Sequence, residues 1–168
     1  VLNRCDNEID SHLHVAIKTT TIKPLLAIFI AENTGNRVRI VYTNGNIATF
    51  AGNGVSGYTG DGGQAVNARF TATYGIATDN NLSYYVSMAT SSAPVVRRIF
   101  SGTGIITTFA GTGVAGNGGD NGSPSSATLT LPTAVASDLN GNIYISDFTG
   151  NRIRMTIPTS SYVQVPTA

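Results

Sequence analysis

The stretch Ile47–Phe70 reads IATFAGNGVSGYTGDGGQAVNARF, and it recurs 59 positions later as Ile106–Leu129, ITTFAGTGVAGNGGDNGSPSSATL. Both copies share the frame I-x-T-F-A-G-x-G-V-x-G-x-x-G-D-x-G, followed by an alanine and then a phenylalanine or leucine. A repeat with a fixed offset indicates that one structural unit recurs along the chain.

Other stretches recur in the same way around this pair. Ile28–Arg39, IFIAENTGNRVR, matches Ile143–Arg154, IYISDFTGNRIR, and Gly75–Asp79 matches Ala134–Asp138. Within each unit, β-branched and aromatic residues form short runs that are separated by turn residues such as Asn44-Gly45. Each unit is therefore predicted to hold four short strands.

The predicted strands are, in unit one, Leu13–Lys18, Ala27–Ala31, Arg37–Tyr42 and Asn46–Phe50; in unit two, Tyr74–Thr78, Ser83–Ser87, Val95–Phe100 and Ile105–Phe109; and in unit three, Ala134–Ser137, Ile143–Ser146, Arg152–Ile157 and Tyr162–Val165. The fold class is all-β. The expected architecture is a β-propeller of about three four-stranded blades, either a partial propeller or half of an assembled one. The chain divides into residues 1–23, a divergent segment that holds the candidate first strand; 24–70, blade 1 and its loop; 71–129, blade 2 and its loop; and 130–168, blade 3 with a C-terminal strand.

These motifs resemble the NHL-repeat family of β-propellers, in its long-period form with an A-G-x-G…G-D-G-G loop. The loop is complete at Ala51–Phe70 and altered at Ala110–Leu129, and the core D-x-x-G-N-x-Y-I-x-D…N-R-I-R stands at Asp138–Arg154. The resemblance implies a closed ring of about six blades. Three blades then require more chain, a second copy or a partner on the open blades.

Composition restricts the partners. Charged residues make up 11% of the 168 residues, against about 25% in average domains, and the net charge is +1. Nucleic-acid binding is excluded by the lack of a basic excess, and membrane insertion by the lack of a long apolar run. Asn81 and Asn121 head N-glycosylation triplets, which together with the Ser/Thr-rich composition predict an extracellular or cell-surface location.

Most charged residues recur with the repeat, as expected of residues that serve each blade. Arg37, Arg39, Arg97, Arg98, Arg152 and Arg154 are assigned to the N-R-I-R position, and Glu32, Asp79, Asp138 and Asp147 recur beside the strands. We expect ion pairs or hydrogen bonds between strands or blades, with a rim that binds anions or glycans as the alternative. Asp61 and Asp120 are expected to fix their glycine-rich turns, with a calcium site as the alternative.

Residues outside the repeat give little evidence of catalysis. Asp10, His12 and His14 alternate as in a metal triad, but they are too few and too close for one strand, so no metal, cofactor or catalytic residue is predicted. Cys5 is the only cysteine, and its role is left open. Tyr58 lies in a long loop and is a candidate binding anchor.

Three functions follow in order of preference. The first is a non-enzymatic extracellular interaction module that binds protein or glycan partners through its loops. The second is a structural subunit of an extracellular assembly or filament, a dimer or polymer built through propeller edges. The third, a metal-dependent lyase such as the resemblance implies for some NHL-like propellers, is disfavoured because it needs several histidines near the axis.

Overall fold

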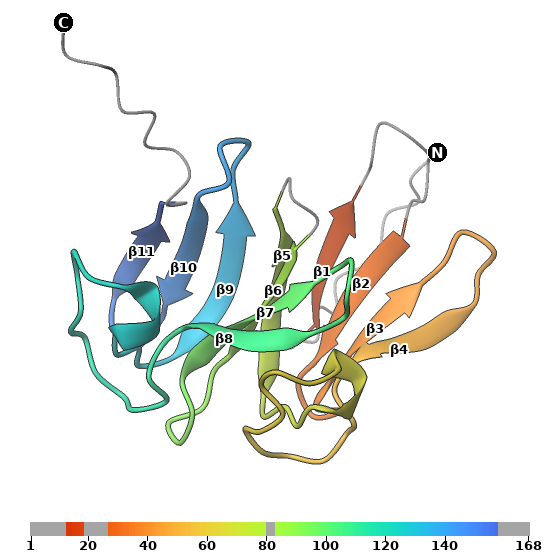
Figure 1. The fold of residues 1–168 in the computed structure, drawn as a ribbon, viewed down its shortest axis with the longest axis horizontal. Coiled ribbons are helices and arrows are strands. Elements are labelled where there is room, and N and C mark those ends of the chain that lie inside the picture. Colours follow the sequence, from red (N-terminus) through yellow and green to blue (C-terminus); the bar gives the residue numbers. More distant parts are fainter. Residues whose placement is uncertain (1–12, 19–26, 80–82, 158–168) are drawn as a thin grey trace, which may run out of the picture.

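The computed structural model describes residues 13–18, 27–79 and 83–157, which form three antiparallel sheets (Figure 1). Each sheet is a meander, so we call the sheets blades 1, 2 and 3. Blade 1 holds β1 (Leu13–Lys18), β2 (Ala27–Glu32), β3 (Arg37–Val41) and β4 (Ile47–Ala51). Blade 2 holds β5 (Thr73–Thr78), β6 (Ser83–Met88), β7 (Val95–Phe100) and β8 (Ile106–Ala110), and blade 3 holds β9 (Pro132–Ser137), β10 (Ile143–Asp147) and β11 (Arg152–Thr156).

Two long loops connect the blades. The first loop, residues 52–72, and the second loop, residues 111–131, each contain one turn of 3-10 helix, η1 (Ala65–Asn67) and η2 (Pro124–Ser126). The all-β class predicted from the repeat is therefore confirmed for the described residues.

Alternation along the strands explains why the sheets stack. In β2, Ala27, Phe29 and Ala31 are buried, whereas Ile28 and Ile30 between them are only half-buried. Successive side chains of a strand point to opposite faces, so one face of blade 1 lies in the core. The core consequently lies between blades rather than inside any one of them.

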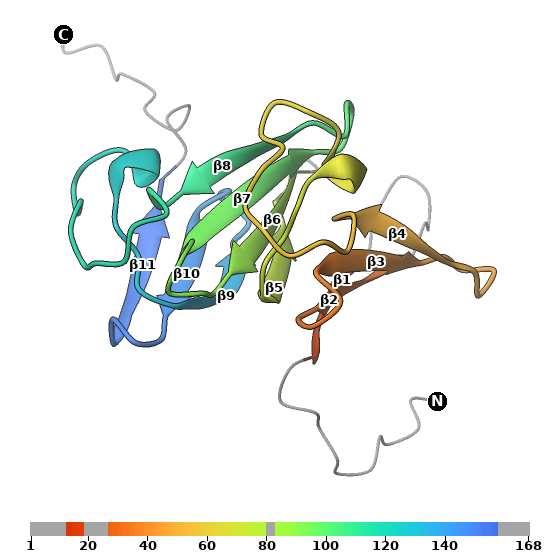
Figure 2. The same ribbon diagram turned by 90° about the horizontal axis from the view of Figure 1, so that it is seen from below.

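The blades lie side by side in chain order, with their first strands next to one another (Figure 2). Strand β5 contacts both β1 and β9. One apolar cluster joins blade 1 to blade 2, and a second joins blade 2 to blade 3. This is the arrangement of neighbouring propeller blades.

Aromatic rings fill the first of these interfaces. Phe29 of β2 lies 4.7 Å from Tyr84 of β6 between ring centroids, and Phe50 of β4 lies 4.7 Å from the same tyrosine. Tilted and edge-to-face contacts of this kind are favourable beyond the area that they bury. They help to fix the position of blade 2 on blade 1.

The strand register corrects one expectation about the arginines. Arg39 pairs with Ile30, Arg97 with Val86, and Arg154 with Ile145, so these three arginines are equivalent. Arg98 follows Arg97 directly and points to the opposite face, because consecutive strand residues alternate. It therefore does not occupy the N-R-I-R position that the sequence alignment assigned to it.

Blade 3 has three strands within the described residues, and β11 forms its edge. In blades 1 and 2 the equivalent strands, β3 and β7, each pair with a fourth strand. The fourth strand predicted at Tyr162–Val165 lies outside the described residues and stays a prediction.

Candidate functional site

A network of buried and partly buried polar side chains joins the first loop to blade 2. One carboxylate oxygen of Asp61 accepts a hydrogen bond from Nε of Arg97 at 3.0 Å and a second bond from the same guanidinium. The other oxygen accepts the backbone N–H of Thr108 at 2.8 Å and its hydroxyl at 2.6 Å. Asp61 thus ties the loop that leaves blade 1 to β7 and β8 of blade 2.

Arg97 is fully buried, and its guanidinium also bonds to the first loop. Its Nη1 donates to the carbonyl oxygens of Thr59 at 3.3 Å and Arg69 at 3.2 Å. Its guanidinium carbon lies 5.6 Å from the ring centroid of Tyr58 and 5.5 Å from that of Phe70. A buried charge must be paired and hydrogen-bonded, and the first loop wraps around Arg97 to meet that need.

Tyr58, the candidate binding anchor of the first loop, does not project freely into solvent. Its side chain is half-buried against the first apolar cluster, and its hydroxyl forms a 2.6 Å hydrogen bond with that of Thr108. The loop folds back onto blade 2 instead of projecting into solvent. Tyr58 is therefore a structural residue of the contact around Asp61.

The surroundings of Asp61 favour the ionised form of its carboxyl group. Partial burial raises the pKa of the Asp61 carboxyl, but hydrogen bonds from Thr108 and Arg97 together with the arginine charge outweigh it and hold that pKa below its usual range. The glycine-rich turn itself is not what the carboxylate stabilises, contrary to expectation. Its partners lie 36 and 47 residues further along the chain.

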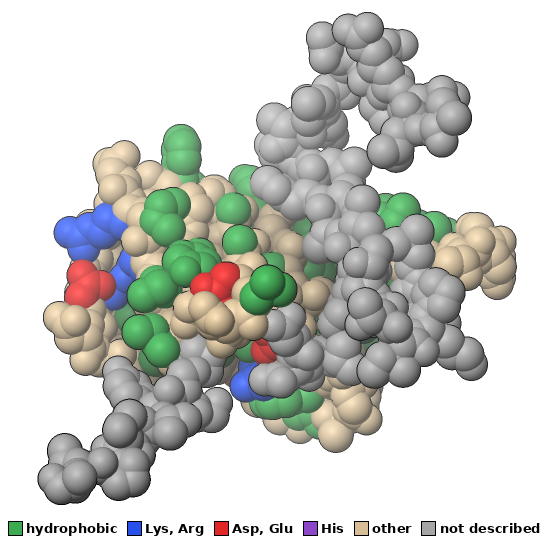
Figure 3. Space-filling model, turned by 90° about the horizontal axis from the view of Figure 1, so that it is seen from above, with side chains coloured by type: hydrophobic (Ala, Val, Ile, Leu, Met, Phe, Trp, Pro, Cys, Tyr) green, Lys and Arg blue, Asp and Glu red, His purple; other side chains and the backbone are tan. Residues whose placement is uncertain are grey.

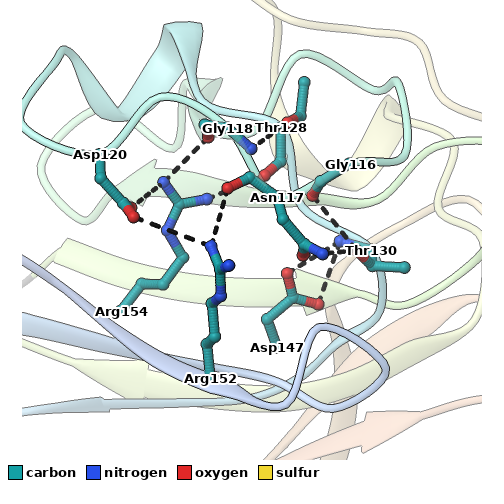
Figure 4. A network of polar contacts seen from close by, with 9 residues as sticks. All are labelled: Gly116, Asn117, Gly118, Asp120, Thr128, Thr130, Asp147, Arg152 and Arg154. Atoms are coloured by element: carbon teal, nitrogen blue, oxygen red, sulfur yellow. Dashed lines mark hydrogen bonds and ion pairs between the residues drawn. The ribbon is translucent and has the colours of Figure 1, made fainter.

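The second loop repeats this contact on blade 3 (Figure 4). Arg154 donates to the carbonyl oxygens of Thr128 at 2.8 Å and Gly118 at 3.0 Å, and to the Asp120 carboxylate at 2.5 Å. Arg152 lies 3.8 Å from the same carboxylate. Asp120 is more exposed than Asp61, so water screens its ion pair with Arg154 more strongly. The two ion pairs nevertheless occupy equivalent positions in successive blades.

Glu32 and Asp147 occupy equivalent strand ends but use different partners. Glu32 lies 3.7 Å from Nη1 of Arg39, as expected of an ion pair between strands. The buried Asp147 instead accepts the backbone N–H groups of Thr130 and Leu131, at 2.9 and 2.6 Å, and so ties the end of the second loop to β10. Arg37, equivalent to Arg152, donates to the carbonyl oxygen of Asn53 at 3.3 Å.

Asp79 and Asp138 lock equivalent hairpins. Asp79 accepts the backbone N–H of Ser83 at 2.8 Å and the hydroxyl of Tyr85 at 2.9 Å. Asp138 does the same with Asn142 and Tyr144, at 2.9 and 3.1 Å. These bonds join the two ends of the turn between the first and second strands of a blade.

The pKa values in these hairpins reflect the same bonds. Slight desolvation raises the pKa of Asp138, but hydrogen bonds from Asn142 and Tyr144 outweigh it and lower that pKa. Burial, followed by the hydrogen bond to Asp79, raises the pKa of the Tyr85 phenol well above its ordinary range. Asp138 is thus held as an anion and Tyr85 as a neutral donor, which suits a structural lock.

The remaining predicted sites give no cluster. Asn121 is exposed in the turn of the second loop, with a φ of 65°, whereas Asn81, Cys5, Asp10 and His12 lie outside the described residues. Within residues 13–18, 27–79 and 83–157, no three metal-ligating side chains come together, and no helix is long and apolar enough to cross a membrane.

Exposed apolar groups remain at the loops and at the end of the stack. Val55 and Val114 stand at equivalent loop positions and are 49% and 65% exposed. A groove of about 970 Å³ lies between the second loop and β11, with Asp120, Pro124 and Met155 among its lining residues. Hydrophobic side chains also gather on the face in Figure 3, among few charges.

The sequence did not reveal Thr108 as a hydrogen-bond partner of the loop aspartate Asp61. Thr108 was treated only as a strand residue, although it belongs to the repeated T-F-A-G motif. The signal lay in that repetition, since the threonine and the Gly-Asp loop recur together. Asn117, whose carbonyl oxygen accepts a hydrogen bond from Arg152 at 2.9 Å, and Thr130 of the second loop carried no comparable signal.

No family model matches this chain, and no curated protein matches it. Solved structures do match. A Bacteroides thetaiotaomicron protein of unknown function aligns with a TM-score of 0.69 and 22% identity over 77% of this chain and 32% of its own. An auxiliary nutrient binding protein of the same organism aligns at 0.59 and 18% identity over 77% of this chain and 34% of its own, and a streptogramin B lyase at 0.52 and 12% over 91% and 40%.

The matches define the class of protein. At these identities they establish the fold, which is that of part of a β-propeller. This chain spans about a third of the length of the first two structures. Membership of the NHL-repeat family stays a resemblance, because no family model supports it.

Proposed function

We propose that this chain is a non-enzymatic, extracellular interaction module that binds protein or glycan partners through its loops. The observation that carries the proposal is the contrast between the repeated charged side chains and the repeated valines of the loops. The recurrent carboxylates and their equivalent arginines bond within the fold, whereas Val55 and Val114 stay exposed at matching loop positions. Repeated exposed groups on adjacent blades suit an extended partner.

Two further observations support a binding role. Two of the similar structures, from Bacteroides thetaiotaomicron and Bacteroides ovatus, are auxiliary nutrient binding proteins. The low charge and the exposed hydroxyl and amide groups of the second loop also suit a neutral partner better than a polyanion.

A lyase function is the weaker proposal. The resemblance to NHL-like lyases would require several histidines converging on the propeller axis. This sequence has two, His12 and His14, and both precede the second strand of blade 1. The recurrent acids and bases of the described blades meanwhile take part in structural contacts.

The test is a binding screen of the purified chain against immobilised neutral and acidic oligosaccharides and purified extracellular proteins. We expect saturable binding that falls at least about tenfold in a Val55→Ser/Val114→Ser variant. The matched control is Phe148→Ser, which removes an apolar side chain at least as exposed as the two valines from a hairpin outside both loops. Binding that survives the loop changes, or falls equally in the control, would overturn the proposal.

A further inference from the structure

Each blade has two faces, and the strand registers show which side chains occupy the same face in different blades. The leading face, turned toward the preceding blade, carries Ile28, Ile30, Arg39, Val41 and Ile47 in blade 1, and Tyr84, Val86, Arg97, Ile99 and Ile106 in blade 2. The trailing face, turned toward the following blade, carries Phe29, Ala31, Val38 and Ile40 in blade 1, Tyr85, Ser87, Val96 and Arg98 in blade 2, and Tyr144, Ser146, Ile153 and Met155 in blade 3.

Where two blades meet, these faces are buried against each other. Val38 on the trailing face of blade 1 and Ile106 on the leading face of blade 2 share one apolar cluster, and both have no exposed surface. Val96 and Ile145 are equally buried in the second cluster. In the interior of this molecule, the trailing face of one blade is therefore covered by the leading face of the next.

Within the part of the chain that the structure describes, both end faces of the three-blade stack keep exposed apolar side chains. Ile153 and Met155 of blade 3 are 70% and 51% exposed, although Val96, the counterpart of Ile153, is fully buried. On blade 1, Ile47 is 52% exposed, although its counterpart Ile106 is fully buried. The described blades therefore present one leading and one trailing face, which are complementary by the pattern of this molecule's own interior.

Charge distinguishes a second copy from an ordinary preceding blade. Arg97 and Arg154 each receive an aspartate from the loop that precedes their blade. Arg39, their counterpart on the open leading face, is neutralised within blade 1, by Glu32 at 3.7 Å and by the carbonyl oxygen of Ala48 at 3.2 Å. Arg39 therefore has its charge partner within its own blade and does not depend on a carboxylate from a neighbouring loop.

We propose that the trailing face of blade 3 in one copy packs on the leading face of blade 1 in a second copy. Two such contacts join two copies head to tail into one closed ring. Burial of Ile153 and Met155 drives the contact, and Glu32 removes the need for a loop carboxylate. This inference is independent of loop binding, because it uses sheet faces and not Val55 or Val114.

Light scattering coupled to size exclusion tests the stoichiometry of the purified chain. We expect a single species with about twice the 17.4 kDa of the chain. Ile153→Glu and Met155→Glu should each raise the dissociation constant at least about tenfold, because a carboxylate would be buried unpaired. Val114→Glu, at an equally exposed position on the second loop, should leave the dimer intact. A monomer, or an open-ended ladder of oligomers, would overturn the proposal.

Cross-linking tests the orientation of the two copies. In a Cys5→Ser background, Ile153→Cys and Ile30→Cys are prepared separately, since their counterparts Val96 and Ile145 share one cluster. Mixing the two variants under mild oxidation should give a disulfide-linked dimer, whereas each variant alone should stay unlinked. Linkage of Ile153→Cys to itself would mean head-to-head packing and would overturn the head-to-tail contact. Failure of loop binding with an intact cross-link would leave this inference standing.

Discussion

Asp61 of the first loop and Arg97 of β7 form an ion pair across the boundary between two blades, although 36 residues separate them in sequence. The arginine is fully buried and the aspartate is partly exposed, so the first loop shields the Arg97 charge from solvent. The equivalent pair, Asp120 and Arg154, repeats the contact one blade further on. Their difference in burial makes the contribution of each pair measurable.

Asp61→Asn should destabilise the fold more than Asp120→Asn. The first change leaves the buried Arg97 charge unpaired, and we expect a loss of about 2 kcal/mol, less than the 3 to 5 kcal/mol typical of fully buried pairs because Asp61 is partly exposed. The second change affects a 61% exposed carboxylate and should cost less than about 1 kcal/mol. Urea denaturation of both variants measures the difference, and equal losses would contradict the ranking.

The Asp61 contact should also make stability depend on pH. Because the folded protein holds the pKa of Asp61 below its ordinary value of 3.8, the contribution is fully present above that value and is lost as the pH falls through the folded pKa. The gap in unfolding free energy between the wild type and Asp61→Asn should therefore be constant near neutrality and shrink in acid. A gap that widens on acidification would rule this out.

Tyr58→Phe should show whether the Tyr58 hydroxyl stabilises the fold or contributes to ligand binding. Loss of the 2.6 Å hydrogen bond to Thr108 is expected to cost about 1 kcal/mol of stability, because the hydroxyl bonds within the fold. Binding to any ligand found in the screen should be unchanged within error. Thermal unfolding and titration of the same samples check both points, and a selective loss of binding would restore Tyr58 as an anchor.

Gly111→Ala should be harmful and Gly102→Ala nearly neutral. Gly111 follows β8 with a φ of +94°, and a Cβ there would lie 2.5 Å from the carbonyl oxygen of Pro94, so we expect a loss of about 2 kcal/mol or more. Nothing lies within 4 Å of a Cβ at Gly102, where a change within about 0.5 kcal/mol is expected. Denaturant midpoints of the two variants provide the comparison.

The strands were readable from sequence because their signal is local. Leu13–Lys18 and Val95–Phe100 were predicted with the bounds that β1 and β7 have, and the other described strands differ by one or two residues at their ends. Hydrophobic alternation and turn residues act within a few positions of each other. The exception is Arg98, which was assigned to the N-R-I-R position from a divergent repeat although its register places it on the face opposite to Arg97.

The partners of the charged residues could not be read in this way. The sequence by itself determined that Asp61, Asp120, Arg97 and Arg154 recur with the blades and serve the fold, because a repeated unit reuses its contacts. Only the tertiary structure decided that each loop aspartate binds an arginine of the following blade, and that Tyr58 folds inward. The reason is physical: local periodicity fixes which face a side chain occupies, whereas the stacking of blades fixes what that face meets.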